Sequence, residues 1–347
     1  MRSPESNPPS TLIDVARLAG VSPSTVSRIL NGTAKVSDDK RQAVLAAIDQ
    51  MHFAPNPMAQ ALKMGRSMTI GIVVAHFSSP FFDETLRGVD EALRGTGYAS
   101  VIVSGQADAA TETERMRLLV ARKVDGMILL SASLDNEAIA AFARQRPIVA
   151  TGRTISQPRV LGFKFDNEYG AWLAVRHLLE LGHRRIAFLG GPADHADAIE
   201  RLAGYRRALE ETGITFDPAL VGSGEFNEAG GQQGLERLLA AGIGFSAVFA
   251  ANDLSAYGAR LCLYRHGIDV PGQVSLAGFD DLPGSAYTTP PLTTVRQPLF
   301  EMGYTAAASL LGLINGDAPE AVLAPIELVV RESTAPVSQG LRKAPTQ

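Results

Sequence analysis

The sequence contains one cysteine, Cys262, among 347 residues, so no disulfide can form within the chain and a disulfide scaffold is excluded. No run of 18 apolar residues occurs, which predicts that no segment spans a membrane. The polar start, Met1–Ser10, lacks the apolar stretch of a secretory signal peptide, so we expect a cytoplasmic protein. Low-complexity tracts and short repeats are missing too. At 46% hydrophobic and 20% charged residues, the chain has the composition of a globular protein.

Net charge is also small, at -4, and that value alone argues against a nucleic-acid-binding protein. The charge is unevenly distributed, however. The first 66 residues carry eight basic and five acidic side chains, a net of +3, which leaves -7 for the rest. The sequence therefore predicts a basic head that can approach DNA phosphates and an acidic body that is repelled by them.

The head is predicted to contain three short helices. Their apolar stripes are Leu12, Val15, Ala16 and Ala19, then Val26, Ile29 and Leu30, then Val44, Leu45 and Ile48. Gly20 suits the end of the first helix, while Ser22 as N-cap and Pro23 as first helical residue suit the start of the second. The third helix follows Ser37. A tight turn between the first two helices is typical of a helix-turn-helix.

The body alternates short apolar runs with helical patterns. The runs are 70–74, 101–103, 127–130, 148–150, 186–189, 248–250 and 274–277, and helical patterns include 82–93, 168–181, 198–209 and 255–266. Continuous apolar strands separated by helices indicate parallel sheets with both faces covered. Ligands of such sheets bind at the carboxyl ends of the strands, so we expect site residues directly after these runs.

Enzyme motifs are missing from the body. The dinucleotide fingerprint Gly-x-Gly-x-x-Gly does not follow the run 70–74, and Gly222-Ser223-Gly224 is followed by Asn227 instead of a third glycine. No Ser, His and Asp stand in the order or context of a catalytic triad. His183 shows no metal-ligand spacing with another His or Cys, and Cys262 on an apolar helix pattern is expected to be a small buried side chain. We expect no enzyme activity, no cofactor and no metal.

Residues 11–31 resemble the helix-turn-helix of the lac/gal repressor (LacI/GalR) family of transcriptional regulators. The matching residues are Asp14-Val15-Ala16, Ala19-Gly20-Val21-Ser22, Thr25-Val26-Ser27-Arg28 and Asn31. The hydroxyls of the second helix suit phosphates, and Arg28 can contact a guanine edge with two hydrogen bonds. The alternative, a three-helix bundle without DNA contacts, leaves this polar face unexplained. Pro23 and Ser24 depart from well-known relatives, so the operator sequence stays open.

The linker resembles the hinge helix of the same family, in the motif Asn56-Pro57-Met58-Ala59-Gln60-Ala61-Leu62-Lys63. The resemblance implies that this segment folds on the operator and that Leu62 wedges into the minor groove, where an apolar side chain kinks DNA. The alternative for Leu62 is packing against the body. The expected DNA-binding residues are Thr11, Ser22, Pro23, Ser24, Thr25, Ser27, Arg28, Asn31, Asn56, Ala59 and Leu62.

Residues 69–335 resemble the family's effector domain, which is similar to periplasmic sugar-binding proteins. The matching motifs include Ser79-Pro80-Phe81-Phe82, Asp125-Gly126, Asp166-Asn167-Glu168, Gly190-Gly191-Pro192, Asn252-Asp253, Gly278-Phe279-Asp280-Asp281 and Pro291-Leu292-Thr293-Thr294. The resemblance implies an α/β fold: an all-α helix-turn-helix domain followed by a two-lobed, periplasmic-binding-protein-like domain with parallel sheets.

The expected organisation has four parts. They are a headpiece at 1–54, a hinge at 55–67, an effector-binding and dimerisation domain at 68–336 and a flexible tail at 337–347. Within the effector domain, three chain crossings make both lobes discontinuous. The first lobe takes about 68–164 and 295–323, and the second about 165–292 and 324–336.

The resemblance also implies an effector site between the lobes. Its expected residues are Phe81, Phe82, Arg153, Phe165, Asp197, Arg201, Phe226, Asn252, Asp280 and Gln297. Carboxylates, an amide and guanidinium groups suit a polyhydroxylated ligand, and aromatic faces suit the C–H side of its ring. Phe165 and Phe226 have an alternative as ordinary core aromatics. Arg153 either contacts the ligand or pairs with an acidic neighbour on the lobe surface.

Together these features predict a repressor that binds a palindromic double-stranded operator as a homodimer, under allosteric control by a small effector. A sugar is the favoured effector, and a purine or other nucleobase is the alternative within the same fold. A sugar-binding protein without DNA contacts is the second alternative, and the helical head argues against it. The tail has no heptad repeat, so a dimer is expected instead of a coiled-coil tetramer.

Overall fold

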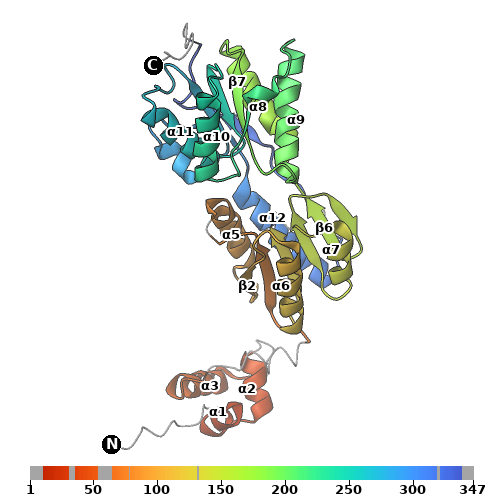
Figure 1. Ribbon diagram of the computed structural model, residues 1–347. Coiled ribbons are helices and arrows are strands. Elements are labelled where there is room, and N and C mark those ends of the chain that lie inside the picture. The colour runs from red at the N-terminus through yellow and green to blue at the C-terminus, as the bar shows by residue number, and fades with distance from the viewer. Residues whose placement is uncertain are drawn as a thin grey trace, which may run out of the picture. The chain divides into compact units, whose positions relative to one another are not determined.

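The computed structural model describes residues 11–30, 36–53, 65–77, 79–130, 133–318 and 321–337. The chain forms two compact units, Met1–Met68 and Thr69–Gln347, and each is described here by itself (Figure 1). The expectations for Asn31, Asn56, Ala59, Leu62 and the tail beyond Val337 lie outside the described residues. No helix in the described ranges is long and apolar enough to cross a membrane.

The first unit contains helices α1 (Leu12–Leu18), α2 (Pro23–Leu30) and α3 (Asp38–Gln50). Val15, Val26 and Val44 are fully buried where the helices meet. Gly20 takes a φ of 64° after α1, and the Ser22 hydroxyl accepts the Thr25 N–H at 3.2 Å, as the sequence predicts.

One prediction for this unit is wrong. The sequence predicts Leu45 in the buried stripe of α3, but Leu45 is 52% exposed. The stripe runs instead through Val44, Ala47 and the half-buried Ile48. The error is one position, which on a helix turns a side chain by about 100° and moves it off the buried face.

The first sheet of the second unit has six strands in the order β2-β1-β3-β4-β6-β5. The strands are β1 (Thr69–Val74), β2 (Ala99–Ser104), β3 (Gly126–Leu130), β4 (Ile148–Thr151), β5 (Ile155–Gln157) and β6 (Val160–Phe163), and the helices between them are α5 (Pro80–Leu93), α6 (Ala109–Ala121) and α7 (Asn136–Ala143). All neighbouring strands pair in parallel except β5 with β6. Parallel strands buried on both faces are confirmed for β1, β3 and β4. Edge strand β2 departs from this expectation, because Val101 and Ile102 are each 38% exposed.

The second sheet also has six strands, in the order β12-β11-β10-β9-β7-β8. The strands are β7 (Ile186–Gly190), β8 (Val221–Ser223), β9 (Ala247–Ala250), β10 (Ser275–Asp280), β11 (Thr293–Arg296) and β12 (Glu327–Val329), and the helices are α8 (Asn167–Glu180), α9 (Ala196–Glu211), α10 (Glu228–Ala240) and α11 (Asp253–Arg265). Only β12 runs antiparallel to its neighbour. We call the part built on the first sheet the first lobe, and the part built on this sheet the second lobe.

The chain passes between the lobes more than once. After β6 it enters the second lobe at α8, and after β11 it returns to the first lobe as α12 (Leu299–Asn315), before β12 rejoins the second sheet. α12 packs closely on α5, because a Cβ at Gly303 would lie 1.8 Å from the Thr85 carbonyl oxygen and one at Gly88 would lie 2.0 Å from that of Phe300. The segments between the lobes carry Phe165 and Gln297.

Candidate functional site

The amino end of α2 presents a polar surface on the first unit. Ser22, Pro23, Ser24 and Arg28 are exposed, and the half-buried Thr25 joins the hydroxyl cluster. The Ser22 hydroxyl oxygen lies 2.8 Å from that of Ser24 and 2.8 Å from that of Thr25. Donors at a helix amino terminus favour an anion such as a phosphate. Five of the seven predicted DNA-contact residues that the structure describes therefore share one accessible surface, with Ser27 half-buried beside them.

Thr11 has a structural role at the start of α1. Its hydroxyl accepts the Asp14 N–H at 3.3 Å, and the Asp14 carboxylate accepts the Thr11 N–H at 3.0 Å. This reciprocal capping box fixes the entry of the chain into α1. The hydrogen bonds from Thr11 lower the pKa of Asp14.

A small cavity lies between residues of both lobes. Its lining residues are Phe81, Thr151, Gly152, Lys164, Phe165, Asn167, Asp197, Gln297 and Met302. Four of the predicted effector residues, Phe81, Phe165, Asp197 and Gln297, meet there. The cavity holds about 10 Å³, which is the space of one water molecule. A sugar-sized ligand therefore requires the surrounding side chains to move apart.

Arg201 and Asp280 form a buried ion pair that reaches this cavity through Gln297. The Arg201 Nη1 lies 3.6 Å from the Asp280 Oδ1, and both side chains are only 4% exposed. Gln297 donates its Nε2–H to the same Oδ1 at 2.6 Å. The Arg201 guanidinium also stacks 3.9 Å from the centre of the Phe279 ring and donates to the Ala251 carbonyl at 2.5 Å. Three predicted effector residues thus form one connected network.

Part of this network remains available to a ligand. Within the described part of the chain, Asp280 Oδ2 and Arg201 Nη2 make no hydrogen bond. Burial raises the pKa of Asp280 to about 6, although Arg201 and Gln297 favour its charged form. Desolvation therefore exceeds the attraction between the two charges, as is common for buried pairs. A ligand that donates hydrogen bonds to this carboxylate would therefore stabilise its charged form.

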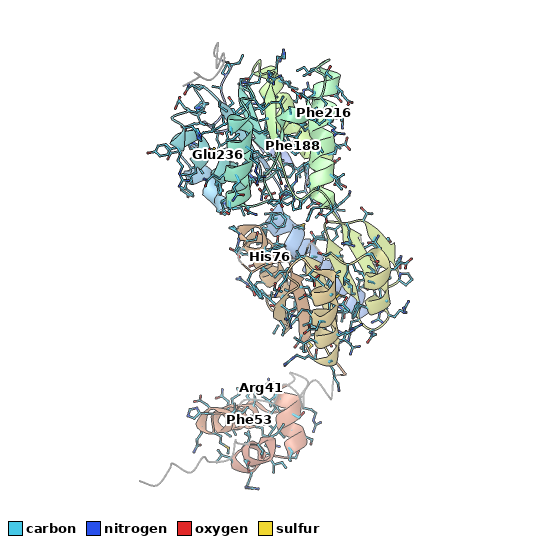
Figure 2. The ribbon with its side chains drawn as sticks, in the orientation of Figure 1. Arg41, Phe53, His76, Phe188, Phe216 and Glu236 are labelled. Carbon is cyan, nitrogen blue, oxygen red and sulfur yellow. The ribbon has the colours of Figure 1, made fainter. Side chains whose placement is uncertain are left out.

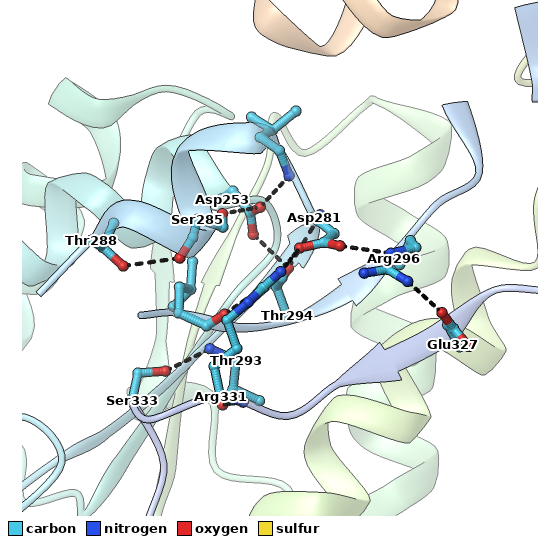
Figure 3. Close-up of polar contacts among 12 residues, drawn as sticks. Asp253, Asp281, Ser285, Thr288, Thr293, Thr294, Arg296, Glu327, Arg331 and Ser333 are labelled. Atoms are coloured by element: carbon cyan, nitrogen blue, oxygen red, sulfur yellow. Dashed lines mark hydrogen bonds and ion pairs between the residues drawn. The ribbon is translucent and has the colours of Figure 1, made fainter. Parts of the chain in front are cut away.

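The backbone at Asp280 is strained. Asp280 has a φ of 114° and Asp281 a φ of 55°, values that non-glycine residues rarely adopt. Ion pairs hold the turn: the Asp281 carboxylate accepts from Arg296 at 2.7 Å and from Arg331 at 2.6 Å (Figure 3). Strain of this kind is concentrated at functional sites, where neighbouring contacts impose it.

Asp253 anchors the same turn. Its carboxylate accepts hydrogen bonds from the Ser285 hydroxyl at 2.5 Å, the Thr294 hydroxyl at 2.6 Å and the Leu282 N–H at 2.8 Å (Figure 3). Complete burial, with the nearby Asp280 charge, raises the pKa of Asp253 to about 8. None of the three residues that donate to Asp253 lines the cavity, so Asp253 serves to hold the segment that carries Asp280.

The raised pKa of Asp280 predicts a pH dependence of stability. Its ordinary value is 3.8 and its folded value about 6, so folding favours the protonated form. The stabilising contribution of that form is complete below pH 3.8 and is lost as the pH rises through 6. The free energy of unfolding of the wild type, relative to Asp280→Asn, should therefore fall by about 3 kcal/mol between acid and neutral pH. Urea denaturation of both proteins across this range measures the difference. If the free energies of unfolding of the two proteins change equally with pH, the prediction is wrong.

Asn167 is the main site residue that the sequence did not predict. It is 3% exposed, and its Nδ2 donates to Asp197 at 3.1 Å and to Glu200 at 3.3 Å. Its Oδ1 accepts the Arg201 Nε–H at 2.9 Å. Asn167 therefore positions two predicted ligand residues at once. A signal was present, since this amide stands at the first position of a helix directly after the lobe crossing.

Asn252 and Phe226 are coupled on the second lobe. Asn252 caps α11 by accepting the Ser255 N–H at 3.0 Å, and it donates to the Phe226 carbonyl at 3.0 Å. The half-buried Phe226 ring fills the space above Gly191, where a Cβ would lie 2.3 Å from the ring. Asn252 thus ties the Phe226 loop to the start of α11, with its amide nitrogen on the loop and its amide oxygen on the helix.

The remaining predicted residues lie on the first lobe. Phe82 is 7% exposed and packs into the core, with its ring edge-on to Phe81 at 5.3 Å. Arg153 donates to the Leu134 carbonyl at 2.5 Å and to Asn136 at 3.2 Å. Burial lowers the pKa of Arg153 despite nearby carboxylates. In this arrangement Arg153 ties a loop to β4, and its neighbour Gly152 lines the cavity.

Comparisons with known proteins match both units. Residues 11–56 match the family described as bacterial regulatory proteins, lacI family, and residues 67–332 match periplasmic binding proteins and sugar binding domain of LacI family. The HTH-type transcriptional regulator GalR of Escherichia coli K12 is 38% identical over 307 residues, covering 88% of this chain and 90% of its own.

Two solved structures extend the similarity to nearly the whole chain. The lac repressor dimer bound to operator and the anti-inducer ONPF has a TM-score of 0.84 at 30% identity, covering 94% of this chain and 99% of its own. The transcriptional regulator CelR in complex with cellobiose has a TM-score of 0.70 at 35% identity, covering 93% and 99%.

Proposed function

The chain belongs to the lacI family of bacterial regulatory proteins and is a DNA-binding transcriptional regulator, and we propose that a sugar bound between its lobes controls its affinity for operator DNA. The observation that carries the proposal is the buried Arg201–Asp280–Gln297 network beside the inter-lobe cavity. It combines donors and acceptors that a polyhydroxylated ligand can satisfy. Aromatic rings of Phe81 and Phe165 border the same cavity and suit the apolar face of a sugar ring.

The proposed organisation has a headpiece at 1–54, a hinge at 55–67, an effector and dimerisation domain at 68–336 and a tail at 337–347. As a homodimer, the protein would place two α2 helices in successive major grooves of a palindrome. Support for the dimer comes from the lac repressor, whose structure is a dimer on operator. An effector that binds one lobe arrangement better than the other shifts the population between them, and operator affinity changes with it.

Arg28 provides the test of the DNA contact. It is exposed on α2, and its Nε–H donates to the Ser24 carbonyl at 3.3 Å. Arg28→Ala should weaken operator binding by about 1–3 kcal/mol and relax base preference at one position of each half-site. Selection from random duplexes with each protein, followed by gel-shift titration, measures both effects. Arg41→Ala, an exchange on α3, is the matched control, and equal losses in both variants would contradict base readout by Arg28.

A panel of ligands tests the effector. The full-length protein is heated with galactose, ribose, cellobiose and other sugars, and a binding sugar raises its Tm by mass action. The same sugar should then change operator affinity in the gel shift. A nucleobase is the second candidate, because Phe81 and Phe165 could stack on a planar ring. A rise in Tm with hypoxanthine or guanine, and with none of the sugars, would contradict the proposal of a sugar effector and support a nucleobase effector.

A further inference from the structure

Three side chains with metal-binding atoms converge on the second lobe, and none of them lines the inter-lobe cavity. Glu236 belongs to α10 (Figure 2), Cys262 belongs to α11, and His266 is the C-cap residue directly after α11. The Cys262 Sγ lies 3.3 Å from the Glu236 Oε2, and the His266 Nε2 lies 3.3 Å from the Glu236 Oε1. One ligand atom from each residue falls within 4.8 Å of the others.

The helix packing explains why these residues meet. α10 and α11 touch backbone to backbone, because a Cβ at Gly231 would lie 2.1 Å from the Ser255 carbonyl oxygen and one at Gly258 would lie 1.9 Å from that of Glu228. Cys262 and then His266 follow Gly258 at intervals of four residues, so they continue the same face of α11. The cluster is therefore held by a rigid helix pair instead of a mobile loop.

The histidine is oriented as a metal ligand. Its Nδ1 lies 3.0 Å from the Cys262 carbonyl oxygen, which can accept a hydrogen bond from an N–H at that position. The Nε2 faces the Glu236 carboxylate at 3.3 Å and is the nitrogen that would bind a metal. Metal-bound histidines commonly donate their second N–H to a backbone carbonyl in this way.

We propose that Glu236, Cys262 and His266 bind one Zn²⁺ ion per chain. A thiolate, an imidazole and a carboxylate are the donors that zinc prefers, and a water completes the tetrahedron. In such a tetrahedron, neighbouring ligand atoms lie roughly 3.3–3.6 Å apart. The Cys262 Sγ and the His266 Nε2 each lie 3.3 Å from a different oxygen of Glu236, so the carboxylate would turn one oxygen toward both on binding the ion. On binding, the S–H bond breaks, an S–Zn bond forms and the proton passes to solvent. The ion would cross-link α10 and α11.

The test uses the full-length chain without an affinity tag, stripped with chelator and kept reduced. Isothermal titration with Zn²⁺ should give one site per chain, and Mg²⁺ should give none because it prefers oxygen ligands. His266→Gln and Glu236→Gln should each weaken zinc affinity at least about tenfold, since each removes a ligand. Co²⁺ in place of zinc should show a near-ultraviolet thiolate-to-metal band that Cys262→Ser abolishes.

His52→Gln is the matched control, because His52 is an exposed histidine of the first unit and is not part of the cluster. Its zinc affinity should equal that of the wild type. Glu236 and His266 are exposed, so they can be substituted without loss of the fold. Their two variants therefore test zinc binding even if Cys262→Ser unfolds. No zinc binding by the wild type, or unchanged affinity in His266→Gln and Glu236→Gln, would overturn the proposal.

Discussion

Asp280→Asn should weaken binding of the effector sugar by roughly 100-fold, or about 3 kcal/mol, while leaving operator binding by the sugar-free protein unchanged. The substitution keeps the shape of the side chain and removes its charge. The amide oxygen takes the place of Oδ1, which accepts from Gln297, so an NH2 group replaces the Oδ2 to which a sugar hydroxyl would donate. The sugar loses a charged acceptor, and hydrogen bonds to charged groups are the stronger kind. Because the headpiece is a separate unit, its α2 surface is preserved.

Isothermal titration with the sugar that gives the largest thermal shift measures the loss, and a gel shift with and without that sugar measures the response. Asp90→Asn is the matched control, since Asp90 is an exposed aspartate on α5 and does not line the cavity. If Asp280→Asn binds the sugar as tightly as the Asp90 variant, Asp280 is not an effector ligand and the site lies elsewhere.

Arg201→Ala should lower the free energy of unfolding of the second unit by about 3–5 kcal/mol. The substitution leaves the Asp280 carboxylate buried without its cation and removes the donors to Asn167 and Ala251. Groups left buried without partners cost their full desolvation. For a unit of this size, we expect a drop in Tm of roughly 10 °C.

Arg207→Ala is the control for that result, because Arg207 lies on the same helix and pairs with Glu168 and Glu211 while 46% exposed. Exposed ion pairs contribute about 0–1 kcal/mol, so the Tm of this variant should stay close to that of the wild type. Scanning calorimetry separates the transition of the second unit from that of the headpiece. Equal losses in the two variants would show that burial of the Arg201–Asp280 pair has no special energetic role.

Local sequence patterns predicted the elements well where each pattern has its own physical cause. Ser22, Pro23 and Gly20 set the limits of helices through capping and backbone preference, and the structure confirms them. Strands β5, β6, β8, β11 and β12 were missing from the predicted runs. They are three or four residues long, and their pairing with distant strands holds them in place more than their own composition does.

By itself the sequence determined the family, the helix-turn-helix, the two sheets and the list of polar residues at strand ends, because these depend on residue type and short-range spacing. Tertiary structure alone decided which of those residues share a network. Asn167 joins Asp197 to Arg201 only because α8 and α9 pack side by side, and Cys262 meets Glu236 only because glycines bring α10 against α11. Contacts between residues far apart in the chain depend on how the helices pack, and a local sequence pattern does not say which helices will lie together.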